Sequence, residues 1–85
     1  MVNYQELRFQ SFVDVPRCSC QIGTARDSQN HVHIFLIVKH NGPIYRRSGL
    51  KDNWEDLGGE GEVIRQIVSR STAPRYTTEN HATLN

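Results

Sequence analysis

The stretch "HVHIFLIVKHNGPIYRR", residues 31–47, combines an apolar run with the dipeptide Asn41-Gly42. Asn-Gly is the dipeptide that a two-residue type I′ turn prefers, because both central residues of that turn need positive φ. We therefore predict a β-hairpin that turns at Asn41-Gly42 and places Val38 opposite Tyr45. This hairpin is expected to form the centre of an antiparallel sheet.

The predicted register divides the hairpin into two faces, because side chains alternate across a strand. One face is aliphatic, and we expect it to be buried in the core; it carries Val32, Ile34, Leu36, Val38 and Tyr45. The other face mixes polar and apolar side chains; it carries His31, His33, Phe35, Ile37, Ile44 and Arg46.

The residues on either side of the hairpin predict a strand and a helix. Upstream, apolar residues occupy alternate positions at Leu7, Phe9, Val13 and Val15, which is typical of a strand buried on one face. Downstream, the segment 60–71 carries an apolar stripe at helical spacing and has Pro74 beyond its end. We predict an α+β fold in which a small antiparallel sheet of three or four strands is covered by one C-terminal helix at about residues 60–71.

The size and charge of the chain limit what it can be. With 85 residues, of which 36% are hydrophobic, residues 1–71 are expected to form a single small α+β domain and residues 72–85 a flexible C-terminal tail. So small a domain often needs a disulfide, a metal or a partner for stability. The net charge is +1, which is too small for strong nonspecific binding to nucleic acid.

The sequence predicts an intracellular, cytoplasmic protein with no membrane partner. The first ten residues contain no apolar signal region, and the longest apolar run, residues 32–38, is too short to cross a bilayer. Cys18 and Cys20 are separated by one residue, a spacing that should not allow a disulfide without severe strain. We therefore expect both thiols to be reduced.

Two cysteines and two histidines begin and end the segment 18–33. If the chain turns near Arg26, then Cys20 lies opposite His31 and Cys18 opposite His33. Opposed side chains lie about 4.5–5.5 Å apart at Cβ, and two thiolates with two imidazoles can hold a structural zinc. One interpretation is thus a zinc site. The interpretation we favour is that the cysteines pack as small apolar residues and that no metal binds.

The triplet His31-Val32-His33 resembles the metal-binding motif of the HUH rolling-circle nucleases. The upstream segment "FVDVPRCS", residues 12–19, resembles the first motif of that family. This resemblance implies that the paired histidines hold a divalent metal and that Tyr76 attacks a DNA phosphate. An HUH-like nicking nuclease is the most remote of the alternatives.

The chain contains no glycine-rich phosphate loop after a strand and no nucleophile elbow, so we predict that it is not an enzyme and needs no cofactor. We expect a small regulatory protein that acts by occupying a protein partner, with a homodimer as a further option. The alternative is a module that binds RNA or single-stranded DNA through an Arg, His and aromatic sheet face. The candidate partner-binding residues are Arg17, Phe35, Arg46, Arg47, Trp54, Glu55 and Asp56.

Overall fold

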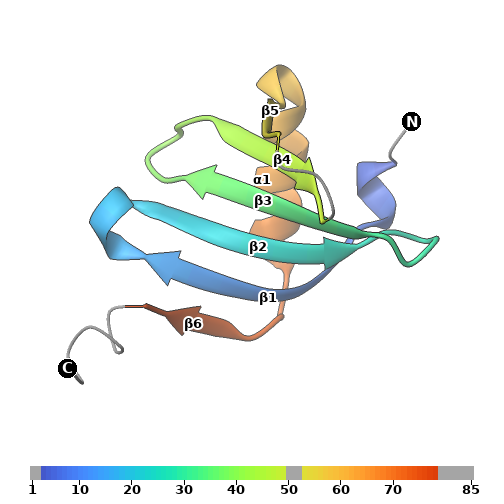
Figure 1. The fold of residues 1–85 in the computed structure, drawn as a ribbon, viewed down its shortest axis with the longest axis horizontal. Coiled ribbons are helices and arrows are strands. Elements are labelled where there is room, and N and C mark those ends of the chain that lie inside the picture. Colours follow the sequence, from blue (N-terminus) through green and yellow to red (C-terminus); the bar gives the residue numbers. More distant parts are fainter. Residues whose placement is uncertain (1–2, 50–52, 79–85) are drawn as a thin grey trace.

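The computed structural model of the chain describes residues 3–49 and 53–78, which form one six-stranded sheet with a helix, α1, packed on one side (Figure 1). The strands are β1 (Arg8–Val15), β2 (Cys20–Arg26), β3 (Val32–Val38), β4 (Ile44–Ser48), β5 (Glu55–Asp56) and β6 (Arg75–Thr77). The helical elements are α1 (Gly61–Arg70) and the short 3₁₀ turns η1 (Tyr4–Glu6), η2 (Pro16–Cys18) and η3 (Gly58–Glu60).

The sheet is mixed and has the strand order β5-β4-β3-β2-β1-β6. Strands β1 to β5 pair antiparallel, whereas β6 returns after α1 and pairs parallel to β1. The α+β class is thus confirmed, but the sheet is larger than the three or four strands predicted. Residues 75–77, which were predicted to lie in a flexible tail, form β6, and residues 79–85 of that predicted tail lie outside the described residues.

The central hairpin is present, but its turn lies one residue earlier than predicted. His40 and Asn41 both have φ of 60°, and the Gly42 amide donates to the Lys39 carbonyl over 3.3 Å. This register pairs Ile37 with Ile44, whereas the predicted register would place Arg46 opposite Ile37. Pairing two apolar side chains on the buried face favours the observed turn.

The buried face of the hairpin is the opposite of the predicted one. Phe35, Ile37 and Ile44 are buried beneath α1, and the aliphatic face that we expected to be buried is only half-buried. The core joins these side chains to the fully buried Ile64 of α1. The remaining buried members of the core are Leu7, Phe12, Ala25 and Leu57.

A β-bulge in β1 explains why simple alternation failed there. Phe9 pairs with Ala25, but Ser11 pairs with the next residue, Thr24, so that Gln10 is extra. Phe9 and Phe12 therefore both face α1, and their rings stack with centroids 4.9 Å apart. Phe12, which falls outside the alternate positions of the predicted strand, is fully buried.

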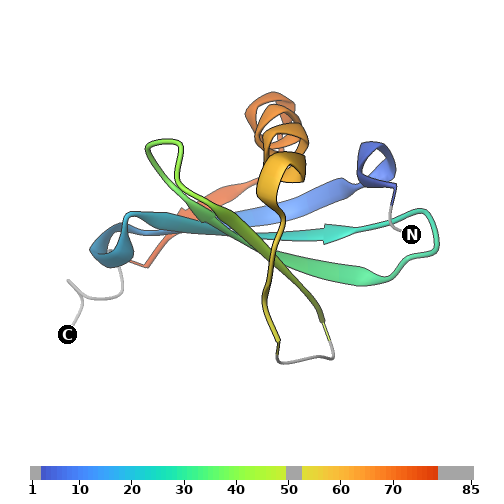
Figure 2. The same cartoon turned by 90° about the horizontal axis from the view of Figure 1, so that it is seen from above.

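The sheet has two unlike faces. Figure 2 shows α1 and η1 on the same side of the sheet, and no described helix covers the other side. We call this uncovered side the open face. Its half-buried apolar residues include Val13, Ile22, Ile34, Leu36, Val38 and Tyr45.

Candidate partner-binding surface

The centre of the open face is a row of side chains in register across the sheet. Val13 pairs with Ile22, Ile22 with Leu36, and Leu36 with Tyr45. Tyr76 of β6 lies beside Val13 and is 58% exposed. This row presents aliphatic surface across its middle strands, with one tyrosine towards each edge of the sheet.

Arginines lie beside the aliphatic row, towards the end of the sheet where β1 begins and β2 ends. Arg8 pairs with Arg26, and Arg47 pairs with Ile34, which places all three on the open face. The Arg47 guanidinium lies 5.2 Å from the ring centroid of Trp54, a cation–π distance. Stacking holds these two side chains against each other at the rim, where Trp54 is 42% exposed.

Carboxylates are scarce on the open face. The described strands contain Asp14, Glu55 and Asp56. Asp14 and Glu55 lie in rows that face α1, since they align with Ile37 and Phe35. Only Asp56, at the outer edge, falls on the open face among these strand residues. The open face is therefore cationic at one end, although the whole chain is almost neutral.

A chain of polar contacts crosses the opposite face. The Asp27 carboxylate lies 2.9 Å from Nε2 of His33, and Nε of Arg46 donates to Nδ1 of His33 over 3.1 Å. Nη1 of Arg46 then donates to the Glu55 carboxylate over 3.0 Å. His33 is 4% exposed. Because both of its ring nitrogens are engaged, His33 orients Arg46 and has no nitrogen left for a metal or for proton transfer.

Asp27 binds His33 and also organises the β2–β3 connection. Its carboxylate also accepts the backbone N–H groups of Gln29 and His31, each over 2.9 Å. The hydrogen bond from His33, followed by that from the His31 amide, lowers the pKa of Asp27 to about 2. Asp27 was not among the residues predicted from the sequence. Its only signal was an Asp at the start of a polar turn, where the side chain can cap backbone amides.

The predicted zinc arrangement is not formed. Its register was wrong, because Cys20 pairs with Val38 and His33 with Ala25. The Asp27-capped loop sets this register by delaying the turn to residues 27–31. Among residues 3–49 and 53–78, no group of three or more His, Cys, Asp or Glu side chains is placed to hold a metal ion.

The two cysteines are bonded to each other, contrary to the predicted reduced thiols. Cys18 and Cys20 form a disulfide with their Cα atoms 5.3 Å apart, inside the usual range for such bonds. Ser19 between them has φ of 51° and ψ of 46°. This left-handed residue bends the backbone and brings the two side chains together. The prediction of severe strain assumed an extended strand through Ser19.

The other predicted site residues are dispersed. Phe35 is fully buried and Arg46 is bound in the polar chain, so the predicted nucleic-acid face is covered. Arg17 is exposed on η2, remote in sequence from Arg47 and Trp54 on the open face. The side chain of His31 is 71% exposed. The HUH arrangement of two histidines sharing a metal is therefore not seen here.

The predicted set omitted the residues that make the open face distinctive. Arg8 and Arg26 were missed because their cross-strand pairing depends on the bulge, and Leu36 because the wrong face of its strand was expected to be buried. No described helix is long and apolar enough to cross a membrane. Comparison with protein-family models, with curated proteins and with solved structures found no match to this chain.

Proposed function

We propose that the protein is a small non-enzymatic binding module whose open face docks on a protein partner. The observation that carries this proposal is the half-buried aliphatic row bordered by Arg8, Arg26 and Arg47. A contiguous apolar surface with a polar rim is typical of a protein interface. The expected partner surface is apolar at its centre and carries carboxylates beside it.

The chemistry of the row supports a protein in preference to a nucleic acid. Unpaired bases bind by stacking on aromatic rings, but the middle of the row consists of Val13, Ile22 and Leu36. Aliphatic side chains gain most by excluding water against other apolar groups, about 25 cal/mol per Å² buried. The tyrosines lie towards the edges, and the Trp54 ring already contacts Arg47.

Charge complementarity supports a partner with carboxylates. Three arginines lie on the open face, and the described strands place only Asp56 there as a counter-charge. Nε of Arg47 is also buried without a hydrogen-bond partner among the described residues. Arginine binds carboxylates through a planar fork of N–H donors. Docking of acidic groups would thus add specificity to a contact driven by apolar burial.

Variants matched for charge can test the docking surface. Baits would be the full chain, Leu36→Glu and Arg47→Gln, with Gln66→Glu and Arg70→Gln as controls on exposed positions of α1. A partner captured from the host's extract would be purified and titrated against each protein by calorimetry. We expect Leu36→Glu and Arg47→Gln to weaken binding by roughly tenfold or more, and the two controls to bind like the parent.

Three results would overturn the proposal. The first is equal affinity of the purified partner for the parent and for Leu36→Glu, when circular dichroism shows that the variant is folded. The second is binding that nuclease abolishes and that falls steeply with salt, which would indicate nucleic acid. The third is a concentration-dependent dimer in ultracentrifugation that Leu36→Glu disrupts, which would make a second copy the occupant of the open face.

A further inference from the structure

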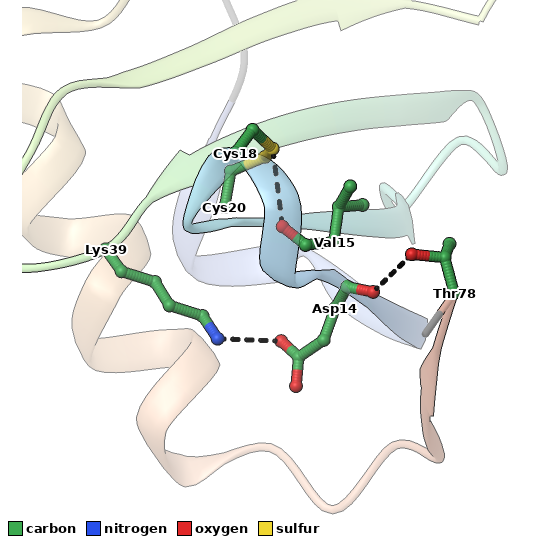
Figure 3. The surroundings of a disulfide bond; sticks show 6 residues. All are labelled: Asp14, Val15, Cys18, Cys20, Lys39 and Thr78. Carbon is green, nitrogen blue, oxygen red and sulfur yellow. Dashed lines mark hydrogen bonds and ion pairs between the residues drawn. A yellow bond between two sulfur atoms is a disulfide. The ribbon is translucent and has the colours of Figure 1, made fainter. Parts of the chain in front are cut away.

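The disulfide at the β1–β2 turn has two sulfurs in very different surroundings. Cys18 is exposed at the end of η2, whereas Cys20 begins β2 and is 4% exposed. Figure 3 shows the bond between them, with Sγ of Cys18 directed towards the Val15 carbonyl oxygen, 3.4 Å away. A thiolate arriving from solvent can therefore reach Cys18 more readily than Cys20.

The turn that carries the disulfide is closed by its backbone. The Ser19 amide donates to the Pro16 carbonyl over 3.1 Å, and the Lys39 amide donates to the Ser19 carbonyl over 2.9 Å. Cys20 is paired with Val15 on one side and with Val38 on the other. These contacts hold the hairpin whether the sulfurs are bonded or not.

The bond contributes little as a structural staple. Its two cysteines are separated by only two positions in the sequence. In the chain-entropy account, a disulfide stabilises a fold by restricting the unfolded chain, and the effect is smallest for the shortest loops. A bond placed to stabilise this domain would join distant segments, such as β1 and α1. The position of the Cys18–Cys20 bond thus calls for a different explanation.

The same backbone keeps the two sulfurs near each other after the bond opens. Ser19 is held in the left-handed conformation by the turn, with φ of 51°, so that both side chains still project together. Groups held in this way react with a high effective concentration. The dithiol can therefore close again without any search by the chain. In the reduced form, the Val15 carbonyl oxygen can accept a hydrogen bond from the Cys18 thiol.

We propose that Cys18 and Cys20 form a thiol–disulfide exchange site whose substrate is a dithiol. One substrate thiolate attacks Sγ of Cys18, a bond forms between those two sulfurs, and the Cys18–Cys20 bond breaks. Cys20 leaves with the electron pair and takes a proton. The second substrate thiolate then attacks the substrate sulfur bonded to Cys18 and releases Cys18, which is also protonated. The substrate becomes a disulfide, and two electrons and two protons pass to the cysteine pair.

Reduced glutathione and dithiothreitol are suitable probes for this site. The oxidised full chain would be mixed with glutathione, quenched in acid, alkylated and mapped by mass spectrometry. We expect glutathione on Cys18 and the alkyl group on Cys20, formed roughly tenfold faster than exchange with a linear disulfide such as hydroxyethyl disulfide. Dithiothreitol should reduce the pair fully, and oxidised glutathione should restore the bond.

Single-cysteine variants and thermal melts provide the controls. Cys20→Ser should form a mixed disulfide at Cys18 that persists, because no second thiol can resolve it, whereas Cys18→Ser should react slowly through the buried Cys20. The melting temperature of the reduced parent should lie within about 8 °C of the oxidised one.

A larger loss of melting temperature would show that the bond is a structural staple and would overturn the proposal. Glutathione found mainly on Cys20, or exchange no faster than global unfolding, would overturn it as well. The experiment uses no macromolecular partner, so its outcome is independent of docking at the open face.

Discussion

Truncation of Ile64 tests whether α1 is docked where the structure places it. Ile64 is fully buried in the core, whereas Ile67, one turn further along the same helix, is half-buried. Ile64→Ala removes the equivalent of three methylene groups, each contributing about 0.8 kcal/mol, and leaves a cavity. We expect a loss of about 3–4 kcal/mol in the free energy of unfolding.

This loss is large for so small a domain. A chain of 85 residues is expected to have a total stability of about 4–13 kcal/mol. Urea titrations followed by circular dichroism would measure the change, with Ile67→Ala as the matched control at about 1–2 kcal/mol. If Ile64→Ala does not fold, Ile64→Val should still cost about 1 kcal/mol. Equal losses at the two positions would refute the docking of α1 described above.

Other perturbations test the turn, the core and the polar loop. The double substitution of His40→Asn with Asn41→Gly suits a type I′ turn and should raise stability by about 0.5–1 kcal/mol in thermal melts. Gly23→Ala should lower stability by about 1–2 kcal/mol, because the added Cβ would lie 2.7 Å from Cε1 of Phe9. The pKa of Asp27 is lowered in the fold from its ordinary value of 3.8 to about 2. Stability from Asp27 is therefore present above about pH 4 and is lost as pH falls towards 2. Asp27→Asn should remove this dependence in acid titrations followed by circular dichroism.

Periodicity was sufficient to predict the class of the fold. The alternation in residues 31–47 predicted the central hairpin, and the apolar stripe within residues 60–71 predicted an amphipathic helix. The size of the sheet was not predictable in the same way. The strands β5 and β6 have two and three residues, too few for alternation to show. Strand β6 is reached only after α1, and its Arg75 contacts the Val68 carbonyl and the Phe12 ring.

A register error explains why the Cys–His arrangement considered as an alternative is not formed. The turn was predicted near Arg26, but the Asp27 carboxylate caps two amides of the loop and moves the turn towards His31. That change moves the partner of Cys20 from His31 to Val38. The left-handed Ser19 then allows the disulfide. The Asp27 cap is a side chain acting on its own backbone and the Ser19 turn is a local backbone conformation, and patterns of hydrophobicity record neither.

The choice of buried face was the error with the greatest consequence for function. Both faces of β3 carry apolar side chains, and the prediction placed Ile34 and Leu36 in the core and Phe35 and Ile37 on the opposite face. The neighbouring strand decides between them, because Gly23 is paired with Phe35 and lies against the ring of Phe9. Small residues on β2 make room for aromatic rings on that face, and α1 can then cover them. The aliphatic side chains are left on the open face as a consequence. Apolar surface that the domain cannot cover with its own described helix is the physical basis for expecting a partner there.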